Sequence, residues 1–163
     1  MQFTGEEYFR ASTERMRQAR MIHRAGGNSA LAMYCGGLAV ECLLRAFRWA
    51  KDRTFEGRHD LRDLLRASAL LRINEEQMRR KGLGEDKVGE STEALRAATN
   101  EVVTLWHNNL RFASEASLRS YLNRIDRLKG IRGDALKKNA SDLLEAAQII
   151  IGRGADLWTS KQK

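Results

Sequence analysis

The sequence predicts an all-α protein, an up-and-down bundle of about five main helices with short extra helices. No proline occurs among the 163 residues, so a common interruption of long helices is absent. Apolar residues recur at spacings of three and four along several stretches, as on the buried face of a helix. No stretch alternates with period two long enough to form a strand. We expect a single domain over residues 1–163, because 42% of the residues are hydrophobic and can form one core.

Capping residues and glycines delimit the first two predicted helices. Thr4 and Glu7 match a capping box, which predicts that the first helix begins there. Gly26-Gly27 ends this helix, and Asn28 or Ser29 can cap the second.

The second helix, which runs to about Lys51, is the most apolar segment of the chain. Apolar residues on nearly all of its sides predict a central, buried helix. Gly36-Gly37 lies in its middle, where each glycine costs about 1 kcal/mol of helix propensity. A close approach of another helix would explain why this cost is tolerated.

Leucine-rich stripes separated by polar or glycine-containing segments predict the remaining helices. A polar loop at residues 52–59 comes first. Helices are then expected over residues 61–71, within 73–90, and over 90–112, 114–128 and 134–157.

The chain is basic, with a net charge of +8, and most of its 29 basic residues are arginines. The planar guanidinium group suits phosphate recognition better than the point charge of lysine does. However, the basic residues are interleaved with acidic ones along the chain. The charge alone therefore fits both a nucleic-acid-binding face and an ordinary basic surface.

The two cysteines and the apolar stretches indicate a cytoplasmic protein. Cys35 and Cys42 would lie ~10 Å apart along one helix, beyond the ~7 Å reach of a disulfide, and are expected to be small core residues. The N-terminus lacks the pattern of a signal peptide. The apolar stretch from Leu38 to Leu44 contains Glu41 and is too short to span a bilayer, so we expect no membrane partner.

Glu41 and Arg45 form the first polar constellation, in the middle of the most apolar helix. They lie four residues apart in the favourable acid-before-base order. An ordinary intrahelical ion pair explains this spacing. A polar site between helices is the alternative, since acids are rarely buried without a partner.

His59 and Asp60 form the second constellation, directly before the leucine-rich third helix. Asp60 can cap that helix by accepting its free N–H groups. His59 is then either incidental to the capping turn or a contact to another part of a site.

The third constellation is the segment from Trp106 to Phe112, which is dense in polar and aromatic residues. On a helix, His107 and Arg111 would share a face, with Asn108 and Asn109 beside them. A neutral histidine can act as a general base and an arginine can stabilise charge on a phosphorane, which would suit metal-free RNA cleavage through the 2′-hydroxyl. The alternative is a helix end whose side chains bond neighbouring backbone groups.

No cofactor or metal site is predicted. The cysteines and histidines lack metal-ligand spacing. Gly82-Leu83-Gly84 begins like a dinucleotide-binding loop, but Lys87 occupies the place of the third glycine and no strand precedes it.

In their order along the chain, these segments resemble the HEPN family over roughly residues 7–153. That family has an Ala-rich second helix carrying an acid and a base, a His-Asp/Ser-Leu turn, a later aromatic and Arg-aromatic segment, and an Ala-rich final helix. The matching segments here are Glu41 to Ala46, His59-Asp60-Leu61, Trp106 with Asn108-Asn109 and Arg111-Phe112, and Asp142 to Gly152.

The resemblance implies a helical bundle that forms a homodimer with a cleft at the interface. It also implies RNA, or a partner such as a nucleotidyltransferase-like antitoxin or another defence-system protein, as the ligand. The glycine-interrupted second helix is our expectation for the close contact between subunits. Glu41, Arg45, His59, Asp60, Asn108 and Asn109 are the expected cleft residues.

This chain departs from the ribonuclease members, which carry Arg, four to six residues and then His late in the domain. Asn100, Glu101 and Val102 stand at the corresponding positions before His107. We therefore expect a module that binds RNA or an RNA-handling partner, in a toxin–antitoxin or defence context. A metal-independent endoribonuclease toxin using His107 and Arg111 is the alternative, and a nucleotide- or protein-binding regulatory module is the third.

Overall fold

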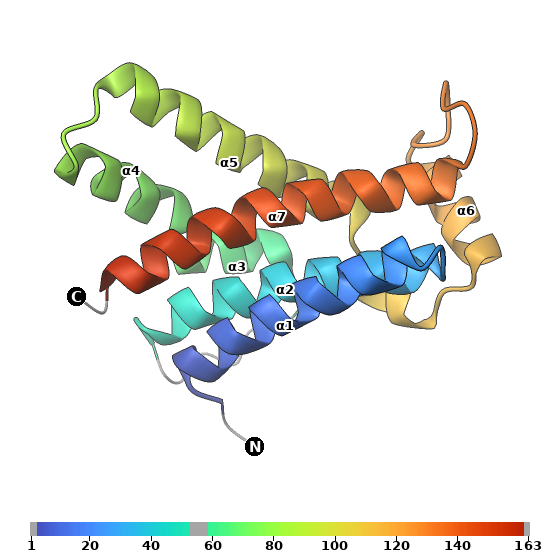
Figure 1. The fold of residues 1–163 in the computed structure, drawn as a ribbon, viewed down its shortest axis with the longest axis horizontal. Coiled ribbons are helices and arrows are strands. Elements are labelled where there is room, and N and C mark those ends of the chain that lie inside the picture. Colours follow the sequence, from blue (N-terminus) through green and yellow to red (C-terminus); the bar gives the residue numbers. More distant parts are fainter. Residues whose placement is uncertain (1–2, 53–58, 162–163) are drawn as a thin grey trace.

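The computed structural model describes residues 3–52 and 59–161, and every regular element in them is a helix (Figure 1). The all-α bundle is thereby confirmed. The predicted loop at 52–59 lies largely outside the described residues. The elements are α1 (Gly5–Arg24), α2 (Ser29–Trp49), α3 (Leu61–Ser68), α4 (Leu70–Arg80), α5 (Glu85–Leu105), the 3-10 helix η1 (Asn108–Phe112), α6 (Glu115–Arg124) and α7 (Ala135–Lys161).

Three long helices run side by side along the length of the molecule. Figure 1 shows α1 and α2 as an antiparallel hairpin, with α7 alongside and running in the direction of α2. Helices α4 and α5 form a second hairpin that packs against α7. The connection through η1 and α6 lies at the end of the bundle away from the C-terminus.

Helix α2 lies at the centre of the core, as its composition predicts. Its side chains at Met33, Leu43, Leu44 and Phe47 are fully buried. Among the described residues, α2 alone is long and apolar enough to cross a membrane, and 78% of the qualifying stretch is buried inside the protein. A buried core helix meets the same criterion.

The glycine pair in α2 allows close packing within the chain. A side chain at Gly36 would press into Leu143 and Leu144 of α7, and one at Gly37 would overlap the indole ring of Trp106. The expected close helix approach is confirmed for Gly36. Both surfaces are covered by the chain itself, so these glycines cannot supply the close contact between subunits that we expected.

Several helix boundaries differ from the predicted ones; α6 ends at Arg124 and not at 128, and α7 runs on to Lys161. Ala69 adopts the left-handed conformation, with φ of 54°, and separates α3 from α4, where one helix over 61–71 was expected. The buried Ser68 hydroxyl accepts a hydrogen bond from the backbone N–H of Leu70 at this break, at 3.3 Å. The expected 90–112 helix is also wrong at both ends, since α5 begins at Glu85 and ends at Leu105.

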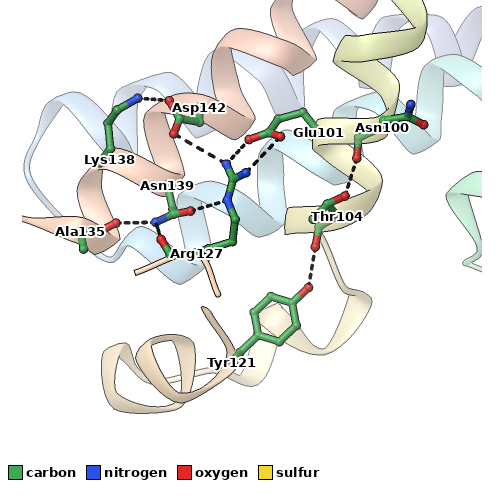
Figure 2. A network of polar contacts seen from close by, with 9 residues as sticks. All are labelled: Asn100, Glu101, Thr104, Tyr121, Arg127, Ala135, Lys138, Asn139 and Asp142. Carbon is green, nitrogen blue, oxygen red and sulfur yellow. Dashed lines mark hydrogen bonds and ion pairs between the residues drawn. The ribbon is translucent and has the colours of Figure 1, made fainter. Parts of the chain in front are cut away.

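A polar network fixes the connection between α6 and α7 (Figure 2). The fully buried Asn139 donates from its amide to the carbonyl oxygens of Ala135 and Arg127, at 2.8 and 2.9 Å. The guanidinium of Arg127 pairs with Glu101 of α5 and, at 3.8 Å, with Asp142 of α7. The network therefore holds three segments together at the end of the bundle that carries η1.

Candidate functional site

A buried carboxylate on α2 joins two of the predicted constellations. Glu41 is only 2% exposed, and its Oε1 accepts from Nε of Arg45 at 2.8 Å. The Nδ1 atom of His59 lies 2.8 and 3.0 Å from the two carboxylate oxygens of the same glutamate. The pair predicted within α2 is therefore real, and His59 is a third member of it.

This contact fixes the orientation of the His59 ring. An ionised carboxylate only accepts hydrogen bonds, so Nδ1 of His59 carries the proton and donates to Glu41. The ring's other nitrogen, Nε2, is then the one left for a ligand. Since the His59 side chain is 51% exposed, a ligand can reach it. A carboxylate that orients a histidine in this way is a common arrangement for a general base or a hydrogen-bonding group.

An open cavity of about 370 Å³ lies at His59, and we call it the histidine pocket. Its walls come from the start of α3 and from the end of α5 with the segment that follows it. The lining residues are His59, Asp60, Leu61, Arg62, Val103, Trp106, His107 and Asn108. The structure thus brings together segments that are far apart in the sequence.

Asp60 caps α3, as predicted, and one oxygen of its carboxylate is hydrogen-bonded to the helix. Its Oδ1 accepts from the backbone N–H groups of Arg62 and Asp63, at 2.8 and 3.1 Å. Asp60 is the single acidic residue among the described residues that line the pocket. Glu41, behind the pocket, is likewise paired with Arg45 and His59, and Arg62 brings a positive charge to the lining.

Trp106 anchors the opposite wall of the pocket. Its indole ring lies on Gly37, and its Nε1 donates to the carbonyl oxygen of Tyr34 at 3.1 Å. Helix α5 ends at this residue, whose backbone is extended. In this conformation the chain leaves the helix and the indole ring is buried against α2. Trp106 thereby directs the following residues toward His59.

The segment after Trp106 is a 3-10 helix, so the expected α-helical face shared by His107 and Arg111 is wrong. His107 precedes η1 in an extended conformation, and its Nδ1 accepts from the backbone N–H of Asn109 at 3.1 Å. In a neutral ring the proton is then on Nε2, which makes His107 a donor toward a ligand. Arg111 does not line the histidine pocket and lies over the ring of Phe112.

The two asparagines of this segment differ in position. Asn108 lines the pocket, and its buried side-chain oxygen has no hydrogen-bond partner within the described chain. A ligand hydroxyl or amino group would satisfy that acceptor. Asn109 is exposed and faces a second cavity instead.

The cysteines contribute no reactive group to the site. Both are free, and burial raises the pKa of the Cys42 thiol to about 11, with the negative charge of neighbouring Glu41 adding to the effect. No cluster of three or more His, Cys, Asp or Glu residues suited to a metal ion occurs in the residues that the structure describes.

Val103 and Arg62 are the pocket residues that the sequence did not predict, and Arg62 is the charged one. Arg62 directly follows the His-Asp-Leu turn. Its place in the first turn of α3, beside the capping residue Asp60, was the one hint in the sequence that it lies near the site. In a chain with so many arginines, nothing else in the sequence distinguished it from Arg66 one turn later.

Comparisons with protein-family models, with curated proteins and with solved structures give no match to this chain. The fold and the site define a helical bundle with a polar pocket between the start of α3 and the end of α5.

Proposed function

We propose that this chain is a HEPN-like module that binds RNA through the histidine pocket. The observation that carries the proposal is the convergence of His59, which Glu41 holds, and the Trp106–Asn108 segment on one cavity. The order of the motifs along the chain supports the HEPN-like part of the proposal. The net charge of +8 favours a polyanionic ligand.

The chemistry of the pocket matches an RNA strand. The guanidinium of Arg62 and Nε2–H of His107 can bind phosphate oxygens. The unpartnered oxygen of Asn108 can accept from a 2′-hydroxyl or a base amino group, and the 2′-hydroxyl distinguishes RNA from DNA. His59, held by Glu41, offers a further polar contact in the same cavity.

The proposal extends to a homodimer that acts with a toxin–antitoxin or defence-system partner, as the HEPN resemblance implies. Light scattering on the purified protein tests the dimer directly. A mass of one chain at all concentrations would contradict that part of the proposal.

Binding of fluorescein-labelled single-stranded RNA, measured by fluorescence anisotropy, tests the central claim. The apparent affinity should fall by orders of magnitude between about 50 and 200 mM salt if several phosphates are contacted. Arg62→Ala should lower the affinity and reduce the slope of log affinity against log salt by about 1.

Two matched variants separate the pocket from the general charge of the protein. Arg66→Ala removes the same charge one turn along α3, outside the pocket, where Arg66 pairs with exposed Asp63. His23→Ala on α1 is the control for His59→Ala. Equal effects of each pair, or no binding at low salt, would contradict the proposal.

A metal-independent endoribonuclease is the second candidate, and the Glu41–His59 pair favours it. Nε2 of His59 could take the proton of a 2′-hydroxyl while that oxygen attacks the phosphorus; the 5′-oxygen leaves as a hydroxyl with a proton from water, and a 2′,3′-cyclic phosphate remains. His107 could donate to the phosphate, and Arg111 would have to approach from outside the pocket. Binding ranks first because Arg111 lies outside the pocket and the chain lacks the late Arg-then-His spacing of the ribonuclease members.

Incubation of the protein with total RNA in EDTA separates these two candidates. Cleavage that persists in EDTA and disappears in His59→Ala and His107→Ala, with Arg111→Ala tested beside them, would establish the enzyme. Binding without cleavage supports the leading proposal.

A further inference from the structure

A second cavity adjoins the histidine pocket on the other side of His107. It measures about 310 Å³ and lies between η1 and α6. We call it the Phe112 pocket, after its most exposed wall; His107, Asn109, Ser117, Tyr121 and Arg124 also line it. Its volume falls within the ~300–1,000 Å³ range of small-ligand sites.

Two aromatic rings line this cavity, and each lies close to an arginine side chain. Phe112 is 76% exposed, an unusual position for a large apolar side chain. The guanidinium carbon of Arg111 lies 4.6 Å from the centre of the Phe112 ring, and that of Arg124 lies 5.8 Å from the centre of the Tyr121 ring. Each guanidinium group and the ring beneath it together present a flat, positively charged surface on which a planar ligand can stack.

The second aromatic ring is fixed in place. Figure 2 shows the Tyr121 hydroxyl donating to the carbonyl oxygen of Thr104 near the end of α5, at 2.9 Å. Burial raises the pKa of Tyr121, so the phenol stays neutral. A wall that is already positioned loses little entropy when a ligand binds.

The charge around the cavity favours an anion. None of the described residues that line it is acidic. The nearby carboxylate of Glu115 is occupied at the start of α2, where it accepts from the backbone N–H of Ser29 at 2.7 Å. Arg124 and the adjoining Arg111 therefore set the local charge.

We propose that the Phe112 pocket binds a nucleobase of single-stranded RNA. The base stacks on the Phe112 ring, Asn109 and Ser117 bond its edge, and Arg124 faces the phosphate backbone. His107 borders both cavities, so neighbouring nucleotides of one strand occupy the two pockets. This inference rests on the proposed RNA-binding function and assigns a specific part of the strand to a separate subsite.

Anisotropy measurements with two labelled oligoribonucleotides test it. One is a single-stranded RNA, and the other has the same length and phosphates but abasic positions in its centre. The wild-type protein should bind the intact strand roughly 5- to 150-fold more tightly, the range expected for stacking of one base. Phe112→Ala should make the affinities for the intact and the abasic strand about equal, and Phe112→Trp should restore the difference.

Phe3→Ala is the matched control, since Phe3 is another exposed aromatic residue, at the opposite end of α1 from η1. It should leave the ratio unchanged, and circular dichroism checks that each variant is folded.

Three outcomes would overturn the inference. Equal affinity of the wild type for both strands removes the subsite while leaving RNA binding intact. Absence of binding to either strand removes the proposed function and the subsite with it. If Phe112→Ala changes the mass of the protein in solution, measured by light scattering, but not the ratio of the two affinities, Phe112 belongs to a contact between copies of the chain.

Discussion

The indole ring of Trp106 occupies the space that a side chain on Gly37 would need. This contact links the centre of α2 to the end of α5 and to the wall of the histidine pocket. A side chain at position 37 would therefore disturb the core and the site together.

Gly37→Ala should destabilise the protein by about 1–3 kcal/mol, the usual cost of overpacking, although alanine is the better helix former. Urea denaturation followed by tryptophan fluorescence measures the change. Gly89→Ala is the control, because Gly89 is exposed within α5 and a Cβ there meets nothing within 4 Å. That variant should gain about 0.5–1 kcal/mol. Equal effects of the two variants would contradict the packing described here.

Glu41→Gln should lower the free energy of unfolding by about 1–3 kcal/mol, because Arg45 and His59 lose a charged acceptor in a buried position. It should also loosen His59, which NMR of the ring protons would detect. Glu76→Gln is the same change in an exposed pair with Arg72 and should cost less than about 1 kcal/mol. A Glu41 variant as stable as the Glu76 variant would show that the buried contact contributes little.

Cys42 should resist alkylation in the folded protein. A pKa raised from 9.0 to about 11 leaves about 100-fold less thiolate at pH 8, and the rate should keep rising with pH until the raised pKa is reached. Iodoacetamide labelling of a Cys35→Ser variant, read by mass spectrometry, measures the rate with and without urea. Rapid labelling of the folded protein would contradict this prediction.

Asn139→Ala should destabilise the protein by about 1–3 kcal/mol, since two backbone carbonyls lose their donor where Asn139 is fully buried. Asn123→Ala removes an exposed asparagine from nearby α6 and should change the stability by less than about 0.5 kcal/mol. Thermal unfolding of both variants compares them. A larger loss for Asn123→Ala would contradict the role assigned to the network.

The sequence predicted elements whose signals are local. The capping box is confirmed, with Thr4 Oγ1 accepting from the N–H of Glu7 at 3.2 Å and the Glu7 carboxylate accepting from the N–H of Thr4. Asp60 caps α3 through its side-chain carboxylate, as its residue type predicts. Helix α2 is buried because apolar residues occupy nearly all of its sides. The pairing of Glu41 with Arg45 follows from spacing alone.

The features that were missed depend on contacts between distant segments. Nothing near Leu105 ends a helix by propensity, and α5 ends there because Trp106 packs onto Gly37. Ala69 is a good helix former, so its left-handed conformation follows from the packing of α3 and α4 and not from its identity. The contact between His59 and Glu41 could not be deduced from two residues in separate segments.

The glycine at position 37 also limits how the chain can vary. The tryptophan ring at position 106 leaves no room for a side chain at 37, so the two positions should change together in related sequences. A relative with alanine at 37 should carry a smaller residue at 106, and its pocket should be wider on that side. Substituting both positions at once is therefore the way to reshape the ligand cavity without unfolding the bundle.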